Sequence, residues 1–206
     1  MTSGQPAWEQ GGQPLPKDGD WLLPFLPHLR VHGPRIVEIG CGPGRDAATL
    51  ATHGFEVTAF DRASLQRARE QAPAVRLLRA DLGQTLPFRS GSFDAAASSL
   101  ALHYLPWAKT RAAFSEIHRV LRHGAPFLFR VNATDDYNHG ASEGEELEPN
   151  FRRMPTAHYA ETKRFFDEVS VRDAVADLFR IQHLEHKTIY RYANPKQVWE
   201  CLAVSL

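Results

Sequence analysis

A glycine-rich turn directly after a short apolar run constrains the fold of this chain more than any other feature. Residues 35–46 read RIVEIGCGPGRD, with glycines at Gly40, Gly42 and Gly44, and a helical pattern of apolar residues starts near Arg45. A strand, a glycine turn and a helix in this order form the opening unit of a doubly wound α/β sheet. Glycine lets the backbone approach a ligand closely, and the N–H groups at a helix start attract anions. We therefore expect the turn to hold an anionic, nucleoside-bearing ligand.

The spacing of the glycines separates two classes of nucleoside ligand. The dinucleotide fingerprint is G-x-G-x-x-G, but its third position is Arg45 here, and Gly44 comes one residue too early. Glu38 lies two residues before Gly40. This arrangement resembles motif I of the class I S-adenosylmethionine-dependent methyltransferases. The later strand ends should then carry the other residues of that pattern.

Two further predicted strands are followed by an aspartate. Asp61 closes an alternating strand at 56–60, about 20 residues after the glycine turn, where a carboxylate can accept hydrogen bonds from ribose hydroxyls. Asp81 follows a strand at 75–80, and in the family pattern an acidic residue here contacts the adenine amino group. Each aspartate also has a structural alternative: Asp61 as the N-cap of a helix at 63–71, and Asp81 as a turn or cap residue.

Two later segments extend the resemblance. Residues 86–94 (LPFRSGSFD) and 116–125 (EIHRVLRHGA) are similar to the passages before the fourth and fifth strands of small-molecule methyltransferases of the methyltransferase-11 type. The resemblance implies that S-adenosylmethionine is bound, with S-adenosylhomocysteine as product. In it, Glu38 and the glycine turn hold the methionine moiety, Asp61 holds the ribose and Asp81 the adenine. The expected cofactor-binding residues are Glu38, Gly40, Cys41, Gly42, Gly44, Asp61, Arg62, Asp81, Leu82, Ser98 and Leu100.

The segment after the fourth predicted strand contains the candidate catalytic residue. Residues 98–106 (SSLALHYLP) fall at the topological switch point, where ligands of open α/β sheets bind. His103 lies on this turn, near the place where an acceptor would meet the methyl group, and is a candidate general base. A hydrogen-bonded scaffold role is the alternative for His103. A base is needed only if the acceptor must lose a proton early.

The order of the predicted elements favours a single Rossmann-like domain. Five parallel strands precede a hairpin at 179–206, which matches the doubly wound seven-stranded sheet of the family, ordered 3-2-1-4-5-7-6 with strand 7 antiparallel. We expect 1–34 to form an N-terminal arm and cap, and 35–206 to form the methyltransferase domain with a lid insertion at about 132–165. A solvated loop is the alternative for the lid. The candidate substrate contacts of the lid are Tyr137, His139, Arg152, Arg153, His158 and Tyr159.

The charge balance argues against a polyanionic partner. The 206 residues include 24 Lys and Arg and 24 Asp and Glu, so zero net charge gives no reason to expect nucleic acid or a membrane surface. The two cysteines form no disulfide framework, no Cys/His cluster has zinc spacing, and the N-terminus lacks a signal-peptide pattern. We expect a cytoplasmic monomer or homodimer that holds no metal. No N-P-P-Y segment follows the fourth strand, which favours a small-molecule acceptor.

Two other functions stay open on the sequence alone. An NADP-dependent oxidoreductase would use a related sheet, and Arg62 beside Asp61 is a faint sign of one. The missing third glycine and the terminal hairpin argue against it. A non-catalytic S-adenosylmethionine-binding module, acting as a regulator or partner subunit, would carry the same motifs. The identity of the acceptor and the atom that is methylated are not readable from the sequence.

Overall fold

The structure, a computed structural model, describes residues 20–155, 161–190 and 192–206. The arm at 1–19 and the lid candidates His158 and Tyr159 lie outside the described residues. In the described part of the chain, no helix is long and apolar enough to span a bilayer.

The first half of the chain alternates strands and helices. Its elements are η1 (Asp20–Phe25), α1 (Leu26–Leu29), β1 (Arg35–Ile39), α2 (Arg45–Thr52), β2 (Glu56–Asp61), α3 (Gln66–Gln71), β3 (Arg76–Arg79), β4 (Ala95–Ser99), α4 (Trp107–Val120) and β5 (Pro126–Asn132). The second half contains η2 (Tyr137–His139), β6 (Glu145–Glu148), β7 (Phe151–Arg153), β8 (Thr162–Arg164), α5 (Glu168–Val175), β9 (Phe179–Ile189) and β10 (Lys196–Ser205).

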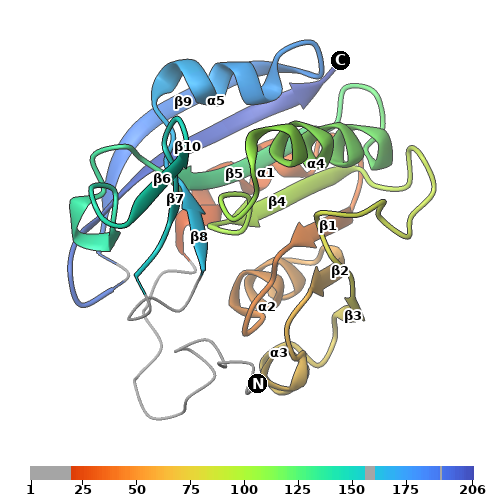
Figure 1. The fold of residues 1–206 in the computed structure, drawn as a ribbon. Coiled ribbons are helices and arrows are strands. Elements are labelled where there is room, and N and C mark those ends of the chain that lie inside the picture. The colour runs from red at the N-terminus through yellow and green to blue at the C-terminus, as the bar shows by residue number, and fades with distance from the viewer. Residues whose placement is uncertain (1–19, 156–160, 191) are drawn as a thin grey trace.

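The main sheet confirms the predicted fold class (Figure 1). Its strand order is β3-β2-β1-β4-β5-β10-β9. Strands β1 to β5 run parallel, and β10 is antiparallel to both β5 and β9. Counted along the chain within this sheet, the order is 3-2-1-4-5-7-6 with the last strand antiparallel. The carboxyl ends of the parallel strands therefore meet the start of β10 at one edge.

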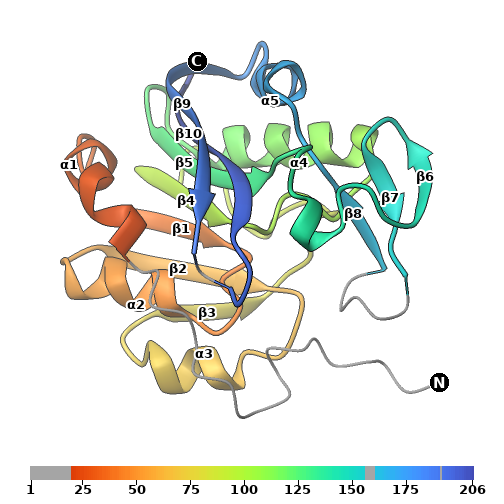
Figure 2. The ribbon, with the colours of Figure 1, turned by 90° about the vertical axis from the view of Figure 1, so that its left-hand side faces the viewer.

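Two apolar layers cover the two faces of the sheet (Figure 2). The layer beneath α4 and α5 contains Phe114, Ile117 and Val120, which recur at helical spacing and are fully buried. The layer beneath the N-terminal helices contains Leu22 and Leu50. Helices on both faces bury the parallel strands from both sides, as this class of sheet requires.

The insertion after β5 is folded rather than a simple loop. Strands β6, β7 and β8 form a separate antiparallel sheet in the order β6-β7-β8. Asn150 adopts a φ of 58° in the turn between the first two strands, a left-handed conformation that asparagine tolerates better than most residues. The sequence pattern does not reveal these short, charged strands.

The helix predicted at 63–71 is shorter in the structure and begins at Gln66. The helix that follows the insertion, α5, begins at a polar N-cap. Asp167 is the N-cap of α5, and its carboxylate accepts the N–H of Ser170 in a capping box.

Asp94 fixes the start of β4 to the start of β1. Its side chain is buried and accepts three hydrogen bonds from Arg35, two from the guanidinium and one from the backbone N–H, at 3.0–3.1 Å. Arg122 adds an ion pair at 3.0 Å. Burial raises the pKa of Asp94, but the hydrogen bonds and charge of Arg35 outweigh it, so the net pKa lies below the usual range.

We expect Asp94→Asn to lower the free energy of unfolding at pH 7 by about 1–3 kcal/mol, because it removes a charged partner of Arg35 and Arg122. A depressed carboxyl pKa stabilises the fold above the pKa of the unfolded chain, and this contribution disappears as the pH falls through the folded pKa. The difference from the wild type should therefore shrink below about pH 4. Urea unfolding across that range measures it, with the exposed Asp173→Asn in α5 as the control. A difference that is independent of pH would contradict this account.

Candidate active site

The glycine turn is fixed to the end of the neighbouring strand β2. The N–H groups of Gly40 and Cys41 both donate to the carbonyl of Phe60, at 2.9 and 3.0 Å, and Gly44 N–H donates to the carbonyl of Cys41 at 2.8 Å. Gly40, Gly42 and Gly44 all have left-handed φ angles, of 69°, 50° and 84°. Only glycine adopts this conformation without strain.

Each glycine of the turn has a different neighbour. A Cβ atom at Gly40 would lie 2.2 Å from the Cβ of Ala101, and one at Gly44 would lie 2.9 Å from the Cα of Ala68. Around Gly42, no atom of the described residues lies within 4 Å of that position. Two glycines therefore permit close packing of the backbone, whereas Gly42 faces open space that a ligand can occupy.

Asp61 lies against the glycine turn, as its position at the end of β2 predicts. One carboxylate oxygen accepts the N–H of Gly42 at 2.9 Å, and the other accepts the N–H of Ala63 at 2.9 Å. Since α3 begins at Gln66, the N-cap alternative for Asp61 is wrong. A carboxylate has about four acceptor sites, so two bonds leave capacity for ligand hydroxyls.

Glu38 and Cys41 complete the same side of the turn. Glu38 is buried at the end of β1. The Cys41 thiol has a pKa raised above its ordinary value, first by burial and then by the charges of Glu38 and Asp61. The charge effects show that the side chains of Glu38, Cys41 and Asp61 lie close together. Together with burial, they keep the thiol neutral.

Asp81 follows the adjacent strand β3. Its carboxylate accepts the N–H of Gly83 at 2.8 Å, and the carbonyl of Asp61 accepts the N–H of Ala80 at 3.2 Å, so the two strand ends lie side by side. Asp81 is exposed and Leu82 is half-buried. The turn-residue alternative for Asp81 thus describes one of its contacts, while its exposed position leaves it accessible to a ligand.

Arg62, Ser98 and Leu100 contribute less directly. Arg62 is exposed, and its carbonyl accepts a hydrogen bond from Arg79. Ser98 is fully buried, and its hydroxyl donates to the carbonyl of Ile39 at 3.1 Å, which ties β4 to β1 beneath the turn. Leu100 has a φ of 59° and packs in a small cluster with residues of β9 and β10.

The turn after β4 contacts both the glycine turn and the turn after β3. We call residues 100–105 the post-β4 turn. Ala101 packs against Gly40, and a Cδ atom of Leu105 lies 3.7 Å from the Cβ position of Gly83. His103 lies between these two contacts in the chain and is only 2% exposed.

The His103 ring lies against the ring of Tyr104 at a tilt of 56°, with a centroid separation of 4.2 Å. Burial, followed by the charges of Lys196 and Lys163, holds the pKa of His103 well below its ordinary value. The imidazole is therefore neutral at physiological pH. Within the described residues, its Nδ1 atom has no hydrogen-bond partner.

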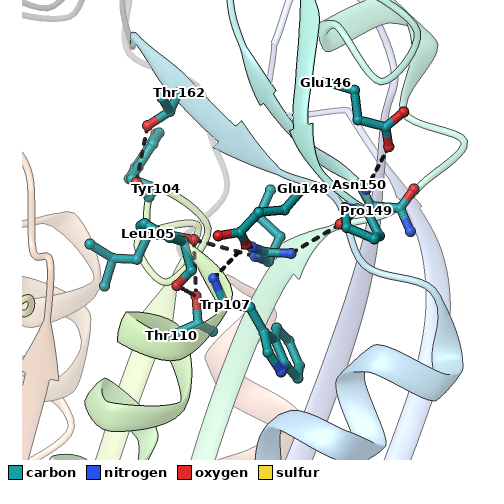
Figure 3. Close-up of polar contacts among 11 residues, drawn as sticks. Tyr104, Leu105, Trp107, Thr110, Glu146, Glu148, Pro149, Asn150 and Thr162 are labelled. Atoms are coloured by element: carbon teal, nitrogen blue, oxygen red, sulfur yellow. Dashed lines mark hydrogen bonds and ion pairs between the residues drawn. The ribbon is translucent and has the colours of Figure 1, made fainter.

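The insertion is docked on the post-β4 turn (Figure 3). The backbone N–H of Arg164 donates to the carbonyl of His103 at 2.7 Å, and its guanidinium donates to the carbonyl of Leu105 at 3.3 Å. The hydroxyl of Thr162 donates to the carbonyl of Tyr104 at 3.2 Å. These contacts hold β8 on three successive residues of the turn.

Glu148 at the end of β6 adds a second attachment. Its carboxylate accepts the N–H of Trp107, the first residue of α4, at 2.8 Å, and it pairs with the guanidinium of Arg164. Two lid candidates serve the small sheet itself, since Arg152 pairs with Glu146 and Arg153 with Glu145. Of the other described candidates, Tyr137 is 64% exposed, and His139 lies beside Lys163, whose Nζ donates to its carbonyl.

The 3₁₀ helix η1 packs against α2, the helix that follows the glycine turn. The indole N–H of Trp21 donates to the carboxylate of Asp46 at 3.1 Å, and the guanidinium of Arg130 lies 4.3 Å from the centre of the Trp21 ring. The N-cap of α2 is Gly44 and makes no side-chain capping bond. The carboxylate of Asp46, in the first turn of α2, is thus directed toward η1.

Several buried polar residues near His103 escape prediction from the sequence. Lys163, Lys196, Asp136 and Asn132 come from four different elements or connections and show no motif. The only sequence signal is their order, since Asn132 and Asp136 come at or after the carboxyl end of β5. His183, Glu185 and Glu200 lie close enough together to hold a metal ion. Both glutamates also form ion pairs with Lys187, and Glu200 pairs with Arg130 as well.

Comparisons with known proteins agree with this arrangement. The family described as "Methyltransferase domain" matches residues 36–124. A malonyl-[acyl-carrier protein] O-methyltransferase from Enterobacter lignolyticus is 32% identical over 132 residues, covering 63% of this chain and 51% of the relative. An uncharacterized methyltransferase from Synechocystis is 33% identical over 97 residues, covering 46% of this chain and 45% of the relative. The chain thus spans about half the length of these curated relatives.

Solved structures share the fold over most of the chain. An S-adenosylmethionine-dependent methyltransferase from Methanosarcina mazei has a TM-score of 0.74 at 21% identity, covering 89% of this chain and 97% of that one. The 1,6-didemethyltoxoflavin-N1-methyltransferase of Burkholderia thailandensis, solved with S-adenosylhomocysteine, has a TM-score of 0.66 at 21% identity and covers 91% of this chain and 79% of that one. Residues 36–124 of this chain thus match the methyltransferase-domain family, and the chain shares the fold of solved S-adenosylmethionine-dependent methyltransferases.

Proposed function

We propose that the chain transfers a methyl group from S-adenosylmethionine to a small-molecule acceptor. The observation that carries the proposal is the pairing of Gly42 with Asp61: a glycine that faces open space donates its N–H to a carboxylate with acceptor capacity to spare. When bound, S-adenosylmethionine supplies an electrophilic methyl group whose sulfur is its own leaving group. The chain then needs to bind and orient the two reactants and to exclude water.

The binding residues follow from the geometry and the resemblance together. Glu38 and the glycine turn receive the methionine moiety, because they combine a buried carboxylate with backbone N–H groups. Asp61 receives the ribose hydroxyls, which are donors. Asp81 and Leu82, at the end of the adjacent strand, receive the adenine. Ser98 supports the turn from below.

The acceptor binds on the side of the post-β4 turn that faces the insertion. In this proposal the small sheet β6-β7-β8 covers the acceptor. The docking of this sheet on residues 103–105 fixes its position over the acceptor. His103 is a residue that contacts the acceptor. Because its pKa is depressed, its imidazole is a weak base, and positioning is its main role.

The relatives do not select the acceptor. The names of two of them specify an acyl-carrier-protein-bound malonyl group and a ring nitrogen of a didemethyltoxoflavin. These acceptors share no chemistry beyond methylation. Support for the acceptor class must therefore come from the residues of this chain.

Isothermal titration calorimetry of the full chain with S-adenosylhomocysteine tests the proposed function. We expect one binding site per chain with a dissociation constant in the micromolar range, about −8 kcal/mol. We expect no binding of NADP under the same conditions. Binding of NADP without binding of S-adenosylhomocysteine would reverse the assignment in favour of an oxidoreductase, and binding of neither would also reject the proposal.

Gly42→Ala provides a sharper test of where the ligand lies. The new methyl group would project into the open space at the turn, so we expect the affinity for S-adenosylhomocysteine to fall about tenfold or more, or 1.4 kcal/mol. The matched control is Gly91→Ala, since Gly91 also has a left-handed φ, of 64°, and open space around it. Both variants should lose a similar unfolding free energy, about 1–2 kcal/mol. Equal affinity of the two variants for S-adenosylhomocysteine would contradict the proposal that this ligand binds at the glycine turn.

A further inference from the structure

The side chain of Asn132, at the carboxyl end of β5, is a buried amide. It is 1% exposed, and among the described residues neither its oxygen nor its nitrogen has a hydrogen-bond partner. An amide left unpaired in a protein interior is costly, because it gives up its hydrogen bonds to water and receives none in return. Such groups are rare in folded proteins, and a functional role or a bound water accounts for them.

A second buried polar group lies on the post-β4 turn. His103 is 2% exposed, and in the part of the chain that the structure describes its Nδ1 atom likewise has no hydrogen-bond partner. Because burial holds the pKa of His103 well below its ordinary value, the ring is neutral, and Nδ1 donates or accepts according to the tautomer. Asn132 and His103 thus offer three polar atoms of neutral groups to a ligand.

One short segment of the chain joins these two residues. The N–H of Arg164 donates to the carbonyl of His103 at 2.7 Å, and the N–H of Phe166 donates to the carbonyl of Asn132 at 2.8 Å. Two residues of chain span at most about 7 Å. The post-β4 turn and the end of β5 are therefore held next to each other.

The same region borders the proposed methyl donor site. Asn132 lies opposite Val198 in the β5–β10 register, and Val198 belongs to the small apolar cluster of Leu100, the first residue of the post-β4 turn. The next residue, Ala101, packs against Gly40 of the glycine turn. A methyl acceptor must lie next to the methyl donor, so a residue at the position of Asn132 can contact the acceptor.

The charged side chains on the sheet face of Asn132 are matched to one another. Arg130, two residues before Asn132, pairs with Glu200 at 2.7 Å. Lys196, two residues before the partner of Asn132 on β10, pairs with Asp136. A charged ligand group placed between these ion pairs would lack a counter-charge, which is costly in a buried site, whereas a neutral polar group needs none.

Lys163, the other buried lysine near His103, has contacts of its own. Its Nζ atom donates to the carbonyl of His139 at 3.1 Å, and the negative charges of Asp136 and Glu143 act on it. We therefore assign Lys163 no role in binding the acceptor. The chemistry of the region favours a neutral ligand group.

We propose that the methyl acceptor of this chain carries a neutral group with an N–H beside a carbonyl, such as a carboxamide or a lactam, which binds to the side-chain amide of Asn132. The Oδ1 atom of Asn132 accepts the ligand N–H, and its Nδ2 atom donates to the ligand carbonyl. His103 contacts the same acceptor through Nδ1. This inference rests on the proposed function, and it adds the chemical class of the acceptor.

The stability of two variants separates a binding role of Asn132 from a structural one. Asn132→Leu and Asn132→Ala both remove the unpaired polar atoms, so we expect the midpoint of urea unfolding not to fall in at least one of them. The matched control is Gln182→Leu, which replaces an exposed amide on β9. A lower midpoint in both Asn132 variants, with the control unchanged, would show that the amide stabilises the fold, and this would overturn the inference.

Titrations of the full chain saturated with S-adenosylhomocysteine test the ligand class. The probes are benzamide, nicotinamide and 2-piperidone. Each is compared with the ketone that lacks the N–H, namely acetophenone, 3-acetylpyridine and cyclohexanone, and the first two also with benzoate and nicotinate. We expect at least one amide to bind about tenfold or more tightly than its ketone, because the ketone leaves the Asn132 oxygen unpaired. The same amide, where it has a matched carboxylate, should also bind more tightly than that carboxylate.

The variants locate this preference in the structure. In Asn132→Leu and Asn132→Ala the preference for the amide should fall about tenfold, while the affinity for S-adenosylhomocysteine stays within about twofold of the wild type. Gln182→Leu should keep the preference.

The inference is overturned if no amide is preferred over its ketone, if the carboxylates bind as tightly as the amides, or if the preference survives in the Asn132 variants. Equal binding of amides and ketones would leave a buried water as the partner of Asn132. The comparison of probes on the wild type stays decisive even if neither variant folds. Because S-adenosylhomocysteine is titrated first, loss of its binding would reject the proposed function separately.

Discussion

The close approach of the post-β4 turn to Gly40 is the contact on which the site depends. A side chain at Gly40 would overlap Ala101, so the absence of a Cβ there permits two strand-end turns to touch. One side of the post-β4 turn then faces the glycine turn and Asp61. Its other side holds His103 against two lysines and carries the docked insertion. A single short turn thus joins a proposed donor site to a proposed acceptor site.

Electrostatics divide this turn into two environments. On the donor side, Glu38 and Asp61 present carboxylates, which suit hydroxyl and ammonium groups of a ligand. On the side of the insertion, burial and then the charges of Lys196 and Lys163 keep His103 neutral. The backbone contacts of Arg164 and Thr162 hold the insertion at that wall.

The sequence predicts the fold and the approach of Asp61 to the glycine turn, because both depend on local patterns. Glycines at fixed spacing and aspartates at strand ends carry their meaning within a few residues of the chain, and Asp61 indeed bonds to Gly42. Residues on the other side of the post-β4 turn, such as Asn132 and Lys196, are far apart in the chain and share a sheet face only through strand register. Asp46 shows the same limit: its carboxylate accepts the indole N–H of Trp21, 25 residues away, and no local pattern indicates this contact.

A crystal structure of the chain with S-adenosylhomocysteine bound tests the central claim most directly. The account predicts the ribose hydroxyls on Asp61, and the ligand sulfur beside the post-β4 turn. A ligand bound away from the Gly40–Gly44 turn, or one whose sulfur points away from the post-β4 turn, would contradict it.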